Sequence, residues 1–250
     1  MMGFLWARLG WIGLGASLFL AFPMQVRSFD AIEQSDLAAL QNRLQELRKA
    51  YSANPKTPEL LIQLASAYLD AGDELYAEST RRIEAYQAGA DFAKNALALD
   101  QRLAEAHFLY AANLGHLAQL KGVLISALFI REIKSHVEQA LELDPHHAPA
   151  LHMMGMMLDG LPWFLGGDAE GSMVYLERAV AADPAYTHAR LNLGKLYLKH
   201  GRIQAAKEQL SLVVGAQFPR SMYVWSSRHK PEALRILKDL ETPRVTVHSK

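Results

Sequence analysis

The sequence contains no cysteine, and this absence removes several classes of chemistry at once. Disulfide bonds, thiolate metal sites and cysteine nucleophiles are all excluded. A surplus of charge is missing as well, since 26 Lys and Arg residues balance 26 Asp and Glu residues. Nucleic-acid binding needs a basic face, so we expect no nucleic-acid partner. Half of the 250 residues are hydrophobic, which is enough for a packed core.

Catalytic motifs are missing too. The chain has no G-x-S-x-G elbow, no phosphate-binding glycine loop and no HExxH pair. Gly166-Gly167-Asp168 instead indicates a helix start with Asp168 as its N-cap. His147 and His152 are five residues apart, which does not align them on one helix face, and His146-His147 is interpreted as a solvated turn. We therefore expect no catalytic residue, no metal ion and no cofactor, and we expect the protein not to be an enzyme.

The first 28 residues differ from the rest of the chain. Arg8 precedes an apolar stretch, residues 9–22, and Arg27 follows it. A short basic start, an apolar core and small residues before Phe29 are typical of a secretory signal peptide. Bilayer spans need roughly 20 apolar residues, more than this stretch offers. We favour a cleaved signal peptide and a periplasmic protein. The alternative is that residues 9–22 anchor the chain to the inner membrane.

One phrase recurs along the chain: an Ala, four positions later an Asn or Asp, and then usually a Pro. The copies are 46, 44 and 39 residues apart. A small residue follows each phrase at a fixed offset, and a Tyr or Leu stands three positions after it. The Asn or Asp positions are Asn54, Asp100, Asp144 and Asp183, and the small positions are Ala65, Ala111, Gly155 and Gly194. This pattern is typical of tetratricopeptide repeats, in which small residues let paired helices A and B approach closely.

The spacing exceeds the standard period of about 34 residues. We therefore expect lengthened helices or extended loops between helix A and helix B, with Gly72, Gly167 and Gly201 ending three of the four A helices. The fold class is all-α, a right-handed superhelix of tetratricopeptide-type helix pairs. The expected organisation is as follows: a signal peptide or uncleaved anchor over 1–28, an N-terminal capping helix over 29–57, four repeats over 58–218, and a C-terminal helix and tail over 219–250.

The repeat register places a set of polar side chains on the concave face, where such arrays usually hold their ligands. These candidate binding residues are His152, Met156, Asp159, His188, Asn192, Lys195 and Lys199. An Asn and two Lys side chains on one face suit a carboxylate. The alternative is a solvated surface without a ligand.

Two apolar segments stand out as candidate interfaces. Gly122–Ile130 has only Ser126 as a polar side chain, so it is either buried on all sides or meets a partner, a ligand or a membrane. Leu161–Leu165 carries Trp and Phe, which either form a partner-contact wedge or fold back between helices, and we favour the second. The residues concerned are Val123, Leu124, Phe129, Leu161, Trp163 and Phe164.

The residues resemble a known family. Glu105-Ala106, Tyr110–Gly115, Ile133-Lys134 and Ala140–Pro145 stand in its order, followed by Leu161-Pro162 and Gly166–Asp168. The order is similar to the T-component (TatT) proteins of tripartite ATP-independent periplasmic (TRAP) transporters. The Leu-Pro…Gly-Gly insertion also occurs in related repeat proteins, including microtubule-dynamics regulators of eukaryotes. The resemblance implies a periplasmic homotrimer that docks the transporter's substrate-binding subunit and passes an apolar ligand. This chain departs from the family by lacking a lipid-bearing Cys.

These observations predict a protein that binds another molecule rather than one that catalyses a reaction. The expected partner is a protein, with a periplasmic substrate-binding protein as the specific candidate. The alternatives are a carrier of a hydrophobic ligand and a generic scaffold for envelope assembly.

Overall fold

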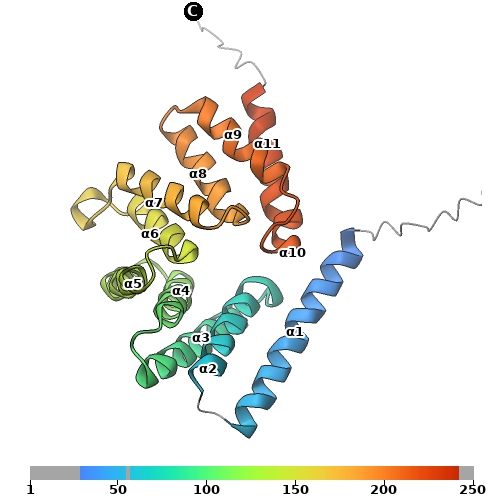
Figure 1. The fold of residues 1–250 in the computed structure, drawn as a ribbon, viewed down its shortest axis with the longest axis vertical. Helices are drawn as coiled ribbons and strands as arrows, with labels where there is room; N and C mark the ends of the chain where they lie inside the picture. Colours follow the sequence, from blue (N-terminus) through green and yellow to red (C-terminus); the bar gives the residue numbers. More distant parts are fainter. Residues whose placement is uncertain (1–28, 55–56, 242–250) are drawn as a thin grey trace, which may run out of the picture.

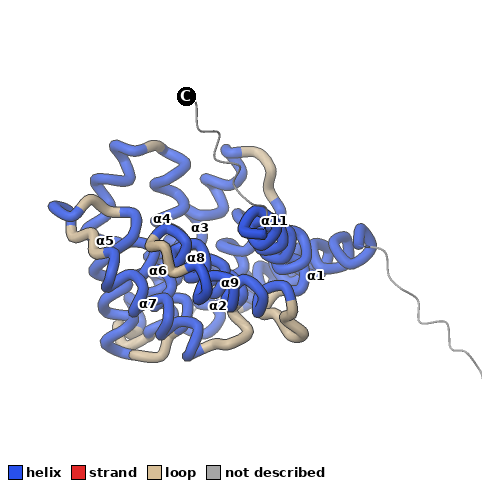
Figure 2. The backbone as a smooth tube through the Cα atoms, turned by 90° about the horizontal axis from the view of Figure 1, so that it is seen from above, coloured by secondary structure: helices blue, strands red, loops and turns tan. Residues whose placement is uncertain are grey.

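The chain folds into paired helices that follow one another around a curved path (Figure 1). The computed structural model describes residues 29–54 and 57–241, so the predicted signal peptide lies outside the described part. Within those ranges there is no β-strand (Figure 2). The α-helices are α1 (Phe29–Ala53), α2 (Pro58–Asp70), α3 (Ser79–Leu99), α4 (Ala104–Lys121), α5 (Val123–Leu143), α6 (Ala148–Gly160), α7 (Ala169–Ala182), α8 (Thr187–Lys199), α9 (Ile203–Val214), α10 (Met222–Val224) and α11 (Lys230–Glu241). The shorter elements are the π-helices η1 (Ala71–Leu75) and η3 (Trp225–His229) and the 3₁₀ turn η2 (Trp163–Leu165).

The recurring Asp ends each B helix in the same way. Asp100, Asp144 and Asp183 adopt extended backbone angles just after α3, α5 and α7. Each carboxylate accepts a hydrogen bond from the backbone N–H two residues further on, at 2.9 to 3.0 Å. A short Asp side chain stabilises a turn in this manner, and a following Pro disfavours helix at the Asp. The same local chemistry therefore starts each new pair.

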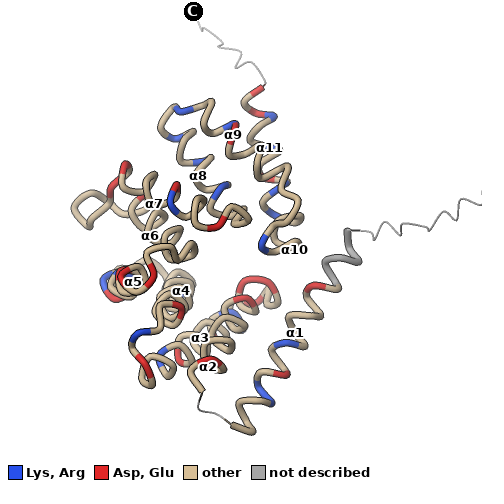
Figure 3. The backbone as a smooth tube through the Cα atoms, viewed as in Figure 1, with Lys and Arg blue, Asp and Glu red and all other residues tan. Residues whose placement is uncertain are grey.

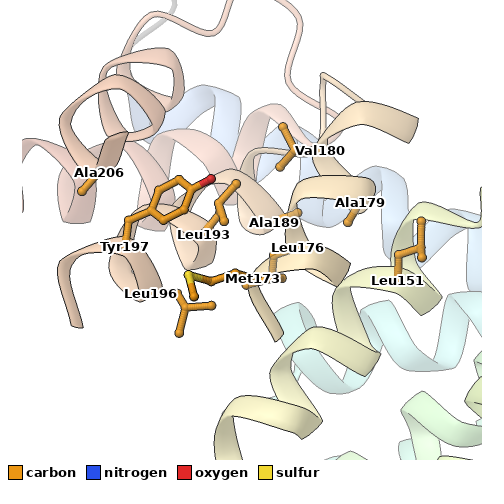
Figure 4. Close-up of a cluster of buried hydrophobic side chains, with 10 residues drawn as sticks. All are labelled: Leu151, Met173, Leu176, Ala179, Val180, Ala189, Leu193, Leu196, Tyr197 and Ala206. Atoms are coloured by element: carbon orange, nitrogen blue, oxygen red, sulfur yellow. The ribbon is translucent and has the colours of Figure 1, made fainter. Parts of the chain in front are cut away.

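The small residues of the A helices lie against the B helices, as the repeat pattern predicts. A Cβ added at Gly155 would come within 2.8 Å of Leu176, and one added at Gly194 within 3.0 Å of Leu210. Ser172 strengthens the first of these contacts by donating a hydrogen bond to the Gly155 carbonyl at 2.8 Å. Figure 4 shows the core that results between α6, α7, α8 and α9.

The residues in excess of the standard period lengthen helices in two repeats and form a loop in a third. The π-helix η1 continues α2, and both α3 and α5 are 21 residues long. Between α6 and α7 the extra residues instead make a loop around η2. The prediction that Gly72 ends its helix is wrong, because Gly72 lies inside η1, where the ring of Tyr86 leaves no room for a side chain. Gly201 does follow the end of α8, at a φ of 72°.

The two ends of the array approach each other. α1 packs on α2 and η1, while α11 packs on α9 and continues from η3. α10 contacts α1, and the Arg228 guanidinium donates a hydrogen bond to the carbonyl of Asp73 at 3.1 Å. The helices thus curve round until the last segment meets the first (Figure 1).

Candidate binding groove

The A helices α2, α4, α6 and α8 face the inside of the curve, and cavities along this side form one groove. A chamber of about 540 Å³ and a second of about 710 Å³ share Leu69, Phe108 and Pro149. A third cavity of about 320 Å³ shares Asp73 and Tyr186 with both. These three connected cavities are called the groove below.

One part of the groove is apolar. The chamber of about 540 Å³ lies between α4, α5 and α6 and is lined by aromatic, methionine and aliphatic side chains. Its apolar lining includes Phe108, Ile130, Met153, Met156, Met157 and Leu161. Methionine side chains are flexible and polarisable, so this chamber can adapt to apolar groups of different shape.

The wall formed by α2 and η1, called the acidic wall, carries carboxylates. Asp70, Asp73 and Glu74 lie close together in the sequence there, and Glu105 of α4 lies in the same cavity. Burial raises the pKa of Asp70 to about 6, although Arg43, 3.7 Å away, acts to lower it. Burial and then the neighbouring Asp70 raise the pKa of Glu74 to about 7. Figure 3 shows this acidic turn across the opening from basic positions near α10.

Hydrogen bonds hold the acidic wall in place. The hydroxyl of Tyr86 donates to the Asp73 carboxylate at 2.6 Å, and the Arg82 guanidinium donates to the Gly72 carbonyl at 2.9 Å. His116 lies 3.9 Å from the same Asp73 carboxylate and stacks on the Tyr86 ring. Asp73 is therefore engaged by protein groups, whereas the carboxylate of Glu74 has no ion-pair partner closer than 4 Å among the described residues.

The opposite wall, called the histidine wall, is formed by α6, α8 and η3. His152 is buried and hydrogen-bonded to Asn192 at 2.9 Å and to the Tyr186 hydroxyl at 3.2 Å. The ring of His188 stacks on His229 with centroids 5.0 Å apart. Burial lowers the pKa of His152 well below its usual value and that of His229 to about 4. These rings are consequently neutral near pH 7.

The sequence-predicted binding residues line two adjoining parts of the concave face. His152, Met156, His188 and Asn192 line the groove, and Lys195 borders its smallest cavity. Asp159 and Lys199 line an adjoining cavity of about 240 Å³, which shares Met156, Asn192 and Lys195 with the groove. Asn192, Lys195 and Lys199 line this cavity together, as the carboxylate prediction requires. Each is also bonded within the chain, Lys195 to Glu232, Lys199 to Asp159 and Asn192 to His152, so carboxylate binding there stays a prediction.

Several residues that shape the groove were not predicted from the sequence. Asp70, Asp73 and Glu74 were visible as an acidic end of the first A helix, but nothing in the sequence pointed to Arg228 beside them. The prediction that His147 belongs to a solvated turn is wrong. This side chain is buried, caps α6 by accepting from the Ala150 N–H, and lies 2.7 Å from Glu105.

Among the described residues, no three His, Asp or Glu side chains lie close enough together to hold a metal ion.

The predicted interface residues include both exposed and half-buried side chains. Val123 and Leu124 are 85% and 83% exposed, whereas Phe129 is half-buried in the core of α4 and α5. In the loop between α6 and α7, Trp163 is 85% exposed and Phe164 67%, while Leu161 lines the groove. The favoured prediction that this loop folds back between helices is therefore wrong for its two aromatic side chains, because η2 turns them outward.

This architecture is similar to that of known helical-repeat proteins. A family model described as regulator of microtubule dynamics protein 1-3 matches residues 25–157, and a tetratricopeptide repeat model matches residues 165–223. Neither description is that of an enzyme. Among solved structures, a thermophilic tetratricopeptide protein of Thermus thermophilus is similar with a TM-score of 0.60 and 19% identity. That match covers 81% of this chain and 95% of the other, and it shows the fold alone.

Curated relatives carry the name of the first family model. Regulator of microtubule dynamics protein 1 of Bos taurus is 29% identical over 198 residues, which are 71% of this chain and 62% of the relative. The Homo sapiens protein of that name is 30% identical over 146 residues, which are 52% of this chain and 46% of the relative. The chain therefore spans less than two thirds of these relatives. The tetratricopeptide fold of this chain is one that binds protein partners.

Proposed function

This chain belongs to the regulator of microtubule dynamics protein 1-3 family, and from that premise we propose that it is a non-catalytic adaptor that holds an extended segment of a protein partner in the groove. The observation that carries the proposal is the continuity of the groove between an apolar chamber and the acidic wall. A helical array presents such a surface on its concave side, where each A helix adds one strip.

The side chains that line the groove indicate which kind of partner segment would bind there. Apolar side chains fit the chamber lined by Phe108 and the methionines. A Lys or Arg side chain of the partner fits beside Asp70 and Glu74, whose pKa values are raised chiefly by burial and then, for Glu74, by the neighbouring Asp70. A cation placed there favours the ionised carboxylates and is bound by them. The proposed ligand is therefore a peptide segment with a basic residue close to apolar residues.

A displayed library of random peptides tests this specificity. With the full chain as bait, the enriched peptides are expected to carry Lys or Arg next to apolar residues. The variant Asp70→Asn/Glu74→Gln is expected to lose the preference for the basic residue. Glu84→Gln, an exposed carboxylate on α3, serves as the matched control and retains it. Enrichment without basic residues, or with the same basic preference in the double variant, would contradict the proposal.

The identity of the partner forms a narrower proposal with two candidates. The name of the relatives suggests a microtubule component, which co-sedimentation of the full chain with polymerised tubulin tests directly. The resemblance to transporter T-components suggests instead the substrate-binding subunit of a transporter. This chain would then form a homotrimer in the periplasm that docks the subunit. Mass spectrometry of proteins retained from a periplasmic extract, with light scattering for the trimer, tests this second candidate. Retention of envelope-assembly proteins would favour the generic scaffold.

The apolar chamber favours one further function, the carriage of a hydrophobic ligand. Its volume of about 540 Å³ lies within the range of small-molecule sites. Native mass spectrometry of the purified full chain would then show a bound apolar compound. Met156→Glu, which places a charge on the lining of the chamber, should release it. A ligand-free mass for the parent protein would contradict this function and leave peptide binding as the role of the groove.

A further inference from the structure

The outer side of the array displays apolar side chains that the groove does not use. On α5 these are Val123, Leu124 and Leu128, and Leu128 is 75% exposed. On the η2 turn they are Trp163, Phe164 and Leu165. These two sets together are called the outer apolar surface below. No charged residue occurs within 122–130 or within 160–167, so both parts are apolar without interruption by charge.

The two parts belong to neighbouring segments. Ile130 of α5 and Leu161 at the base of the η2 loop line the same chamber. A Cβ added at Gly166 would lie 3.5 Å from the ammonium group of Lys134, which places the end of the turn beside α5. Both views of the backbone show the η2 loop on the same side of the molecule as α5 (Figures 1 and 2).

Four backbone N–H groups of the η2 loop are paired within the loop or with α6. The N–H groups of Leu165 and Gly167 both donate to the Pro162 carbonyl, at 2.9 and 3.0 Å, and that of Gly166 donates to Trp163 at 3.1 Å. The Asp168 N–H closes the loop by donating to Leu158 at 3.0 Å. Entry of a loop into an apolar medium is costly when its backbone N–H groups are unpaired. These four paired N–H groups therefore add little to the cost of placing the turn in such a medium.

Cations flank the apolar side chains. Lys121 and Arg131 are exposed on either side of the first turns of α5, and Lys134 lies beside Gly166. Carboxylates lie nearby as well: Glu138 is 3.8 Å from Lys134 and pairs with it, Glu132 accepts a hydrogen bond from Tyr110, and Asp168 caps α7. Glu170, in the first turn of α7, is exposed. Aromatic side chains with basic neighbours match the layered chemistry of an anionic membrane surface, where rings enter the boundary and cations meet phosphates.

We propose that the outer apolar surface docks on the interfacial layer of an anionic lipid bilayer. Trp163, Phe164 and the first turns of α5 enter the boundary between headgroups and acyl chains. Lys121, Arg131 and Lys134 lie against the lipid phosphates. This inference is independent of what the groove binds.

Tryptophan fluorescence tests the proposal in the full chain. Trp6→Phe/Trp11→Phe leaves Trp163 and Trp225, and adding Trp163→Phe leaves Trp225 alone as the matched control. Trp225 donates its indole N–H to the Val213 carbonyl at 2.7 Å, so it reports on the interior. Vesicles of phosphatidylcholine and phosphatidylglycerol with brominated acyl chains should quench the first protein and leave the control unchanged. Because both proteins retain residues 9–22, insertion of that stretch cannot produce the difference.

The cations provide the second arm of the test. Each Lys or Arg near an anionic surface contributes about 1 kcal/mol, or about a fivefold change in binding. Lys121→Gln/Arg131→Gln/Lys134→Gln should therefore reduce the quenching by anionic vesicles to the level seen with phosphatidylcholine alone. Equal fluorescence of Trp163 with and without vesicles would overturn the proposal. Self-association that Trp163→Ser/Phe164→Ser abolishes, seen by light scattering, would overturn it too and assign the surface to a second copy.

Discussion

The acidic wall and the histidine wall of the groove face each other and respond to protons in opposite ways. Burial makes ionisation costly on both, but it raises the pKa of Asp70 and Glu74 and lowers the pKa of His152 and His229. Near pH 7 the histidines are neutral while the carboxylates are close to titration. The two walls differ in the hydrogen-bond partners of their titratable groups. The histidines bond to Asn192, Tyr186 and Thr187, whereas no residue in the described part of the chain bonds to the Glu74 carboxylate.

The largest expected effect is the loss of stability in acid through His229. Its folded pKa of about 4 lies below its usual value of 6.5, so the unfolded chain takes up the proton first. Stability is present above pH 6.5 and is lost as the pH falls toward 4, by up to about 3 kcal/mol. Urea unfolding across this range measures it. His229→Gln should reduce the slope, the rest of which comes from buried His152 and His188. Exposed His200→Gln should leave it unchanged.

Replacing His152 tests whether the histidine wall depends on its hydrogen bonds. His152→Ala leaves Asn192 and the Tyr186 hydroxyl without their buried partner. We expect the free energy of unfolding at neutral pH to fall by about 2–3 kcal/mol. Chemical unfolding checks the value, with exposed His146→Ala as control. A smaller loss of unfolding free energy than in the control would show that these hydrogen bonds do not stabilise the fold.

On the acidic wall, Tyr86 is the residue to change. Tyr86→Phe keeps the ring that packs against Gly72 but removes the hydroxyl bonded to Asp73. The expected loss of unfolding free energy is about 1 kcal/mol, typical of one hydrogen bond. Tyr51→Phe, on a ring that packs edge-on against Phe92, is the matched control. Equal stability of parent and Tyr86→Phe would mean that the acidic wall is held by packing alone.

The smallest effect on the free energy of unfolding comes from Asp70 and Glu74, and its pH dependence is opposite to that of His229. The folded pKa values of Asp70 and Glu74 are raised, so stability is present at low pH and is lost as the pH rises through about 6 and 7. Asp70→Asn/Glu74→Gln should flatten this decline and make the variant more stable than the parent above pH 7. Because the Asp70 side chain is 41% exposed, solvent screening limits the gain to below about 1 kcal/mol. Thermal unfolding at several pH values measures the crossing of the two profiles.

Local signals in the sequence predicted the fold. The Asp turns at Asp144 and Asp183 and the close packing of Gly155 and Gly194 depend on residues within one helix pair, and the structure confirms them. The N-cap role of Asp168 was local as well and is confirmed by its bond to Glu170 N–H. A repeat pattern therefore establishes each pair and the order of the pairs.

The groove was predicted only in part, because its walls combine distant segments. Repeat register brought His152, His188 and Asn192 together on one side. It could not supply the meeting of Arg228 with Asp73, because these residues are 155 positions apart. Nor could it give the direction of Trp163, which depends on the closed turn of η2 and not on helical periodicity.

The contact of Arg228 with the Asp73 carbonyl also limits how such a protein can evolve. Helical arrays commonly grow or shrink by duplication or deletion of whole helix pairs, since each pair contacts only its neighbours. Here the last segment returns to the first, so an added pair would carry Arg228 away from Asp73 and open the groove between α1 and α10. Descendants that keep this groove should therefore vary in loops such as that of η2, and hold the number of pairs constant.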